Sequence, residues 1–200
     1  MRYLELSIKD TEEASKQLAQ KISQDFKPDV VVFIAKGSYI IGDVISKYFE
    51  VPLIEIHAVR EGNKLKNLVS PVLKLIPKSV KNYLRKKELQ SGVHNKNSER
   101  RVYLEKGKDK LQDAENILVV DDSVDTGHTA KQVCEYIIRN FGEKTVRFAS
   151  LNYFEESEKV FKVHYSIYRN HIMVGPWSKD SKEYNDFKKL YSKAKQSGMI

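Results

Sequence analysis

Hydrophobic residues recur along this 200-residue chain at two spacings, which predict different secondary structures. A period of two marks a half-buried strand, whereas a period of three to four marks a helix with one buried face. Leu4, Leu6 and Ile8 alternate with polar residues and predict a short strand. A helix is predicted next, and Asp10 or Thr11 can cap it. Its apolar residues repeat at intervals of four and are Ala14, Leu18, Ile22 and Phe26.

A strand, a turn, a helix and a second strand then follow in succession. Residues 30–34 are continuously apolar and mostly β-branched, as expected of a parallel strand that is covered on both faces. Residues 36–38 form a predicted tight turn, and residues 52–57 form the next predicted strand. The helix between them carries one apolar face, made of Ile41, Val44, Ile45, Tyr48 and Phe49. This order of elements indicates an α/β fold.

The second half of the chain continues the alternation of strands and helices. Gly107 predicts a turn between two strands. The predicted strands lie at residues 102–105, 116–121, 146–153 and 165–168, and the predicted helices at 129–141 and 184–195. We therefore expect residues 1–200 to form a single domain.

Residues 60–101 break this pattern and form a basic insertion. Apolar residues recur there at helical spacing, but Pro71 and Pro77 interrupt any continuous helix. Residues 91–101 are polar without an apolar period, which predicts a mobile loop that could close over a site. The lysine-rich part, residues 61–88, suits a dimer interface or an active-site cover better than a membrane surface.

Composition narrows the class of protein. The chain carries 35 Lys and Arg against 27 Asp and Glu, a net charge of +8, which attracts nucleic acid, anionic lipid or phosphorylated small molecules, or simply aids solubility. The lone Cys134 excludes an internal disulfide and a cysteine-based zinc site. The longest apolar run covers residues 30–35, far below the ~20 residues of a membrane-spanning helix. The first residues are too charged for a secretory signal, so we expect a cytoplasmic protein.

The segment from Ile117 to Thr129 carries the clearest chemistry. An apolar strand leads directly into Asp121 and Asp122, and a short loop containing Gly127 then enters a helix. Carboxylates at the carboxyl end of a strand lie where open α/β sheets bind ligands, and they accept hydrogen bonds from vicinal hydroxyls or help hold Mg²⁺. The free N–H groups at a helix start suit a phosphate. Helix capping alone needs only one Asp or Ser, so this pattern indicates a ligand site.

This segment closely resembles the thirteen-residue phosphoribosyl-diphosphate signature of the type I phosphoribosyltransferases, and is most similar to that of the 6-oxopurine enzymes. The resemblance implies a mainly parallel sheet flanked by helices, with a small hood at about residues 165–200. It implies that Asp121 and Asp122 hold the ribose hydroxyls, directly or through Mg²⁺, and that Asp125 exchanges a proton with purine N7. It implies that residues 125–129 surround the 5-phosphate, and that the residues which bind the diphosphate sugar include Ser123, Thr126, Gly127, His128 and Thr129.

Two further segments resemble the same family. Residues 33–38 are similar to its pyrophosphate loop, which often contains a cis peptide bond, and this implies a catalytic role for Lys36 and backbone binding by Gly37 and Ser38. Residues 172–180 resemble its hood segment, which implies that Ile172 stacks on the base and that the Met173 backbone faces the base edge. Two more residues of that segment are implicated: Trp177, as a structural anchor or a base contact, and Asp180, as a ligand of Mg²⁺.

One departure bears on the base. The 6-oxopurine enzymes place a Lys near the end of the next strand to contact the purine O6, whereas this sequence offers Asn152, which can donate a hydrogen bond but carries no charge.

The resemblance implies an enzyme that transfers a phosphoribosyl group from phosphoribosyl diphosphate to a nucleobase, as a homodimer or tetramer. The alternative is a regulator without catalytic activity that senses the diphosphate sugar and binds nucleic acid through the basic insertion. A diphosphokinase that makes the sugar donor is disfavoured, because such chains resemble two of these domains in tandem.

Overall fold

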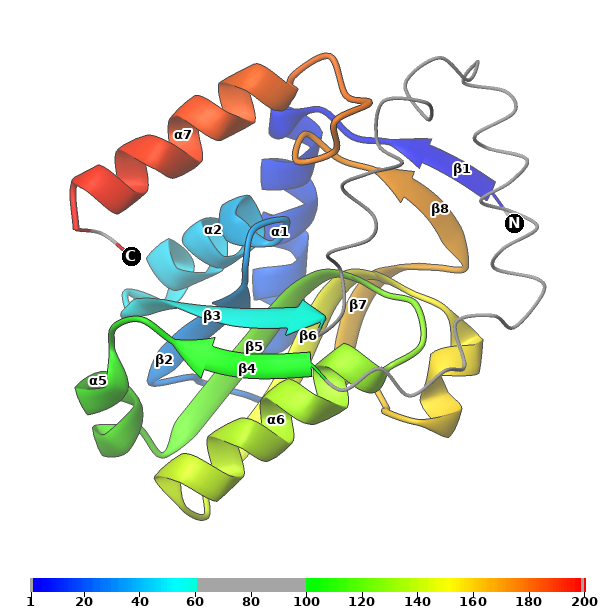
Figure 1. The fold of residues 1–200 in the computed structure, drawn as a ribbon. Coiled ribbons are helices and arrows are strands. Elements are labelled where there is room, and N and C mark those ends of the chain that lie inside the picture. The colour runs from blue at the N-terminus through cyan, green and yellow to red at the C-terminus, as the bar shows by residue number, and fades with distance from the viewer. Residues whose placement is uncertain (1, 61–99, 199) are drawn as a thin grey trace. The chain divides into compact units, whose positions relative to one another are not determined.

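The computed structural model of the protein describes residues 2–60, 100–198 and 200. Its centre is a six-stranded sheet in the order β4-β3-β2-β5-β6-β7, in which neighbours from β3 to β7 run parallel and β4 runs opposite to β3 (Figure 1). The strands are β2 (Val30–Ile34), β3 (Leu53–Arg60), β4 (Arg100–Leu104), β5 (Asn116–Val124), β6 (Thr145–Tyr153) and β7 (Tyr165–Arg169). The α/β architecture predicted from the sequence is thus confirmed.

Helices cover both faces of this sheet (Figure 1). They are α1 (Ile8–Ile22), α2 (Tyr39–Phe49), α5 (Lys108–Asp113), α6 (His128–Phe141) and α7 (Tyr184–Gln196), with a short 3₁₀ helix η3 (Glu155–Lys159). One hydrophobic core joins α1, α2 and α7 to one face of the sheet, and a second joins α5 and α6 to the other. All five residues of β2 are buried between the two layers, which explains their unbroken apolar run.

Local sequence explains where α1 begins. Ser7 caps it, because the Ser7 hydroxyl accepts from the Asp10 amide while the Asp10 carboxylate accepts from the Ser7 amide. The prediction that Asp10 or Thr11 is the cap was therefore wrong by one turn. Ile8 starts the helix and is not part of a strand, since its side chain follows the helical period of the residues after it.

A second, two-stranded sheet lies beside the main one. Strand β1 (Arg2–Glu5) pairs in parallel with β8 (His171–Val174), so the start of the chain and the segment before α7 come together (Figure 1). From here on, hood means β1, β8 and residues 175–183, a different set from the hood expected at about residues 165–200. Neither the extent of β1 nor the strand β8 was expected, because four-residue strands give too short a pattern to detect.

Two other differences concern β5 and its surroundings. The expected turn at Gly107 is instead the start of helix α5, which Gly107 enters with a φ of 80°. Strand β5 also continues three residues beyond its predicted end, so that the two adjacent acids, Asp121 and Asp122, lie within the strand.

By its internal contacts the chain divides into two compact units, residues 1–58 with 102–200 and residues 59–101. The predictions for the basic insertion and the mobile loop lie outside the described residues, except that Arg100 and Arg101 begin β4. Within the ranges described above, no helix has the length and apolar character needed to cross a bilayer.

Candidate active site

The predicted phosphate loop connects β5 to α6. Gly127 occupies the N-cap of α6 with a φ of 80°, a conformation that favours glycine. A Cβ on Gly127 would also lie 2.9 Å from the carbonyl oxygen of Ser157, so a side chain has no room there. The amides of the first turn of a helix lack intrahelical partners and face the positive end of its dipole. This turn, which includes His128 and Thr129, can therefore bind an anion.

The two adjacent carboxyl groups of β5 are half-buried. Burial, together with the nearby charge of Asp122, raises the pKa of Asp121 well above its ordinary value, and burial also raises the pKa of Asp122. A pair of carboxylates that is desolvated and mutually repelling is stabilised by a divalent cation or by donor hydroxyl groups. Both groups are hard oxygen ligands of the kind that Mg²⁺ binds.

The second predicted motif forms the turn between β2 and α2. Its Ala35–Lys36 peptide bond is cis, in agreement with the resemblance to a pyrophosphate loop. The Lys36 side chain is exposed, and its ammonium lies 5.8 Å from the centre of the Tyr191 ring. Ser38 is fully buried and its hydroxyl donates to the Ile34 carbonyl at 2.5 Å, so this hydroxyl is not available to a ligand.

The three predicted motifs meet at Gly37. A Cβ placed on this residue would lie 2.8 Å from Oδ2 of Asp122 and 3.1 Å from Cδ1 of Trp177. Gly37 comes from the turn after β2, Asp122 from β5 and Trp177 from the hood. Segments that are about 85 and 55 residues apart in the sequence thus form one site, as the shared edge of a parallel sheet requires.

The hood residues that the sequence singled out differ in burial. Ile172 and Met173 are half-buried on β8, and Met173 contacts the hydrophobic core beneath. The Trp177 ring lies edge-on to Phe187 of α7, with 6.5 Å between ring centres. Asp180 is exposed. Among the described residues, its carboxylate does not group with those of Asp121 and Asp122 as a set of three metal ligands.

The loop after β5 contains the predicted proton acceptor. Asp125 is exposed, and its carboxylate accepts a hydrogen bond of 3.1 Å from the Ser123 hydroxyl. Ser123 in turn accepts a hydrogen bond of 3.0 Å from the side chain of Asn152. Thr126 is half-buried between these residues and the start of α6.

The position of Asn152 differs from what a base-contacting residue requires. Its side chain is fully buried. The Asn152 nitrogen donates to the main-chain carbonyl oxygen of His171, and the Asn152 oxygen accepts from the His171 amide. Both N–H donors and the carbonyl acceptor are thus used within the protein. The structure places this residue beneath the site and not in contact with open space.

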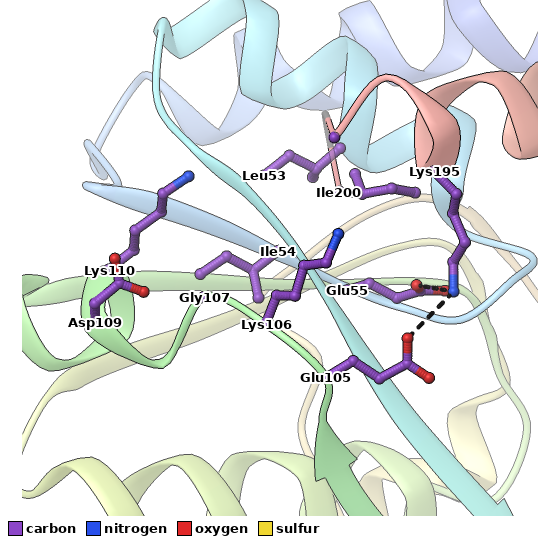
Figure 2. A pocket seen from close by; sticks show the side chains of 11 residues that line it. Leu53, Ile54, Glu55, Glu105, Lys106, Gly107, Asp109, Lys110, Lys195 and Ile200 are labelled. Carbon is purple, nitrogen blue, oxygen red and sulfur yellow. Dashed lines mark ion pairs between the residues drawn. The ribbon is translucent and has the colours of Figure 1, made fainter.

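A polar cluster that the sequence did not reveal lies at one side of β3. Glu55 and His57 alternate on that strand, and with Glu105 they bring one ligand atom each within 4.8 Å of the others. The Lys195 ammonium already lies between the two carboxylates, 2.8 Å from Glu55 and 3.6 Å from Glu105, at the wall of a pocket (Figure 2). Residues two apart in a strand lie on the same face of the sheet, so the sequence could indicate that Glu55 and His57 are neighbours. It could not indicate Lys195, because α7 reaches this place only through tertiary packing.

Comparisons with known proteins bear on the family and the fold of the chain. The family profile of the phosphoribosyl transferase domain matches residues 6–178. No curated protein sequence gives a significant match.

Among solved structures, the fold is similar to a purine phosphoribosyltransferase from Pyrococcus horikoshii, with a TM-score of 0.61, 20% identity, and coverage of 90% of this chain and 97% of that one. It is also similar to a xanthine-guanine-hypoxanthine phosphoribosyltransferase from Helicobacter pylori, with a TM-score of 0.63 and 16% identity over 96% of this chain and 99% of that one. A hypoxanthine-guanine phosphoribosyltransferase from Bacillus anthracis aligns with a TM-score of 0.53 and 21% identity over 82% of this chain and 81% of that one.

Proposed function

Because the chain belongs to the phosphoribosyl transferase domain family, we propose that it transfers the 5-phosphoribosyl group from phosphoribosyl diphosphate to a nucleobase. The observation that carries the proposal is the contact of Gly37 with both Asp122 and Trp177. It joins the parts that this reaction needs: a loop for pyrophosphate, acids for the ribose and a hood for the base.

In the proposed reaction, the bond from ribose C1 to the pyrophosphate oxygen breaks and a bond from C1 to a nitrogen of the base forms. Positive charge develops on the ribose while negative charge grows on the leaving group. Little covalent chemistry falls to the protein, so positioning and electrostatics dominate. Asp121 and Asp122 orient the ribose hydroxyls, and the amides at the start of α6 bind the 5-phosphate.

The leaving pyrophosphate lies against the turn after β2. The Lys36 ammonium and the backbone of Gly37 and Ser38 neutralise and bind its oxygens. Asp121 and Asp122 fit Mg²⁺ as oxygen ligands, and this cation, when bound, supplies further neutralisation of the diphosphate charge. Asp180 is the third proposed ligand, and it would have to approach the pair from its exposed turn.

We propose a 6-oxopurine as the base. Asp125 is the acid of the loop after β5, and it takes or returns the proton of purine N7. Ile172 stacks on the base and the Met173 backbone meets its edge, while Trp177 holds the hood in place. The purine substrates named for the Pyrococcus and Helicobacter structures favour this choice.

One assay tests the proposal. The protein is mixed with Mg²⁺, phosphoribosyl diphosphate and one of six bases (hypoxanthine, guanine, xanthine, adenine, orotate or uracil), and pyrophosphate is measured. We expect release with one or more of the oxopurines and none with orotate or uracil. Asp122→Asn serves as the matched inactive control. If none of the six bases causes pyrophosphate release, and the protein binds RNA with an affinity that falls as salt rises, the alternative of a regulator without catalytic activity is favoured, in view of the net charge of +8.

A further inference from the structure

The side chain of Asn152 joins the two halves of the candidate site. Asn152 lies on β6 and is fully buried. Its Nδ2 donates to the hydroxyl of Ser123 at 3.0 Å and to the carbonyl oxygen of His171 at 3.0 Å, while its Oδ1 accepts from the His171 amide at 3.1 Å. One side chain therefore holds a residue of the β5 acidic segment and the first residue of the hood strand β8.

The pair of bonds to His171 imitates a neighbouring strand. In a sheet, a residue exchanges an N–H and a C=O with its partner, and the Asn152 amide offers the same donor and acceptor to the His171 main chain. This matters because the chain leaves the main sheet at this point. Strand β7 ends at Arg169, Asn170 turns with a φ of 60°, and β8 then pairs with β1.

The residue after His171 is Ile172, the proposed stacking residue for the base. The residue before Ser123 is Asp122, which is proposed to hold the ribose. A fixed distance between Ile172 and Asp122 sets where the base ring lies relative to ribose C1, and the reaction depends strongly on that placement. The Asn152 hydrogen bonds span this distance through buried atoms, so they resist bending more than solvent-exposed bonds would.

We propose that Asn152 is a positioning residue that couples the hood to the ribose site and thereby determines how well the base is bound. This inference rests on the proposed function and gives Asn152 a role different from direct contact with the base. Asparagine suits the role because it supplies two donors and one acceptor at the same time. Leucine has a similar volume but no polar atoms, so it would remove both the acceptor of the His171 amide and the donor to the His171 carbonyl oxygen.

The test compares Asn152→Leu and Ser123→Ala with Ser150→Ala. Ser150 lies on the same strand and is fully buried, and its hydroxyl has no hydrogen-bond partner among the described residues, so it is a matched control. The readouts are the KM for the base, the KM for phosphoribosyl diphosphate, and hydrogen exchange at the His171 amide. The exchange measurement needs no activity, so it tests whether the Asn152 side chain holds the His171 main chain (the clamp) even if the proposed reaction fails.

For Asn152→Leu we expect a KM for the base that is raised about tenfold or more, a KM for phosphoribosyl diphosphate within about threefold of wild type, and faster exchange at the His171 amide, which loses its acceptor. Ser123→Ala should raise the KM for the base by a smaller factor and leave His171 protected, and it tests the coupling even if the Asn152→Leu variant does not fold. Ser150→Ala should match wild type in all readouts. Unchanged exchange at His171 in Asn152→Leu would overturn the proposal, as would an equal rise of both KM values. If the wild-type protein releases no pyrophosphate with any base, the proposed function fails, while altered exchange would still establish the clamp.

Discussion

Gly37 and Asp122 lie so close together that no side chain fits between them. A Cβ on Gly37 would stand 2.8 Å from the Asp122 carboxylate oxygen, well inside normal contact distance. The turn after β2 therefore lies next to the acids of β5, and Cδ1 of Trp177 is 3.1 Å from the same point. A side chain at position 37 would have to displace the Asp122 carboxylate, so the proposed leaving-group loop and ribose site are adjacent.

Substitution of Gly37 tests this relationship. Gly37→Ala should lower kcat/KM by about tenfold or more, because the added methyl group displaces the Asp122 carboxylate or the turn. The measurement is steady-state pyrophosphate release, with thermal unfolding to establish that the protein folds. Gly142→Ala is the control: Gly142 has a φ of 87°, and no atom of the described residues would lie within 4 Å of an added Cβ, so we expect lower stability but unchanged kinetics. Normal kinetics in Gly37→Ala would show that this contact does not matter for activity.

Asp125 is expected to handle the proton of the base. Asp125→Asn should lower kcat by ~10²–10⁴-fold while the affinity for phosphoribosyl diphosphate stays nearly the same. Turnover is measured by pyrophosphate release and affinity by calorimetry with phosphoribosyl diphosphate and Mg²⁺. Full turnover in this variant would dismiss the role in proton transfer, and a large loss of affinity would assign Asp125 to binding instead.

Tyr191 holds α7 onto the sheet, because its hydroxyl donates to the buried carboxylate of Glu55. Tyr191→Phe leaves that acceptor with fewer partners and should lower the free energy of unfolding by about 1–3 kcal/mol. Tyr184→Phe on the same helix is the matched control and should change stability by less than about 0.5 kcal/mol. Urea unfolding measures both. Equal stabilities for the two variants would contradict a structural role for the Tyr191–Glu55 hydrogen bond.

His164 makes the stability of the fold depend on pH. Burial and the nearby positive charges of Arg147 and Lys162 lower the pKa of His164 below its ordinary 6.5, and its Nδ1 accepts a hydrogen bond from the Phe148 amide on β6. The unfolded chain therefore binds a proton more readily than the folded one. The contribution of His164 to stability is complete above about pH 6.5 and is lost as the pH falls through the lower folded-state pKa.

Urea unfolding at pH 7.5 and below pH 6 measures this effect in the wild type and in His164→Asn, which keeps an acceptor oxygen but has no group that titrates. The variant should lose less stability on acidification than the wild type. An identical pH dependence in both proteins would assign the acid sensitivity to other groups.

Much of this architecture could be predicted from local sequence. β2 is one unbroken apolar run, and the apolar residues of α1 recur at every fourth position. Each element has the same environment along its whole length, so its pattern identifies the secondary structure. The segment around Asp121 and Asp122 was recognised for the same reason, because all its parts are contiguous.

The remaining features depend on residues that are distant in the sequence. The pairing of β1 with β8 joins two four-residue strands across most of the chain, and no local period reveals it. Asn152 was expected to face the base, because its position on β6 matched a base-contacting residue. Only the tertiary structure shows that the turn at Asn170 returns His171 to it and uses its hydrogen-bonding groups.

The central claim is that phosphoribosyl diphosphate binds across the end of β5 and the start of α6. The most direct measurement is a crystal structure of the protein soaked with ribose 5-phosphate and Mg²⁺. We expect the sugar hydroxyls at Asp121 and Asp122 and the phosphate on the amides between residues 125 and 129. A ligand bound at any other place, with this segment empty, would contradict the account.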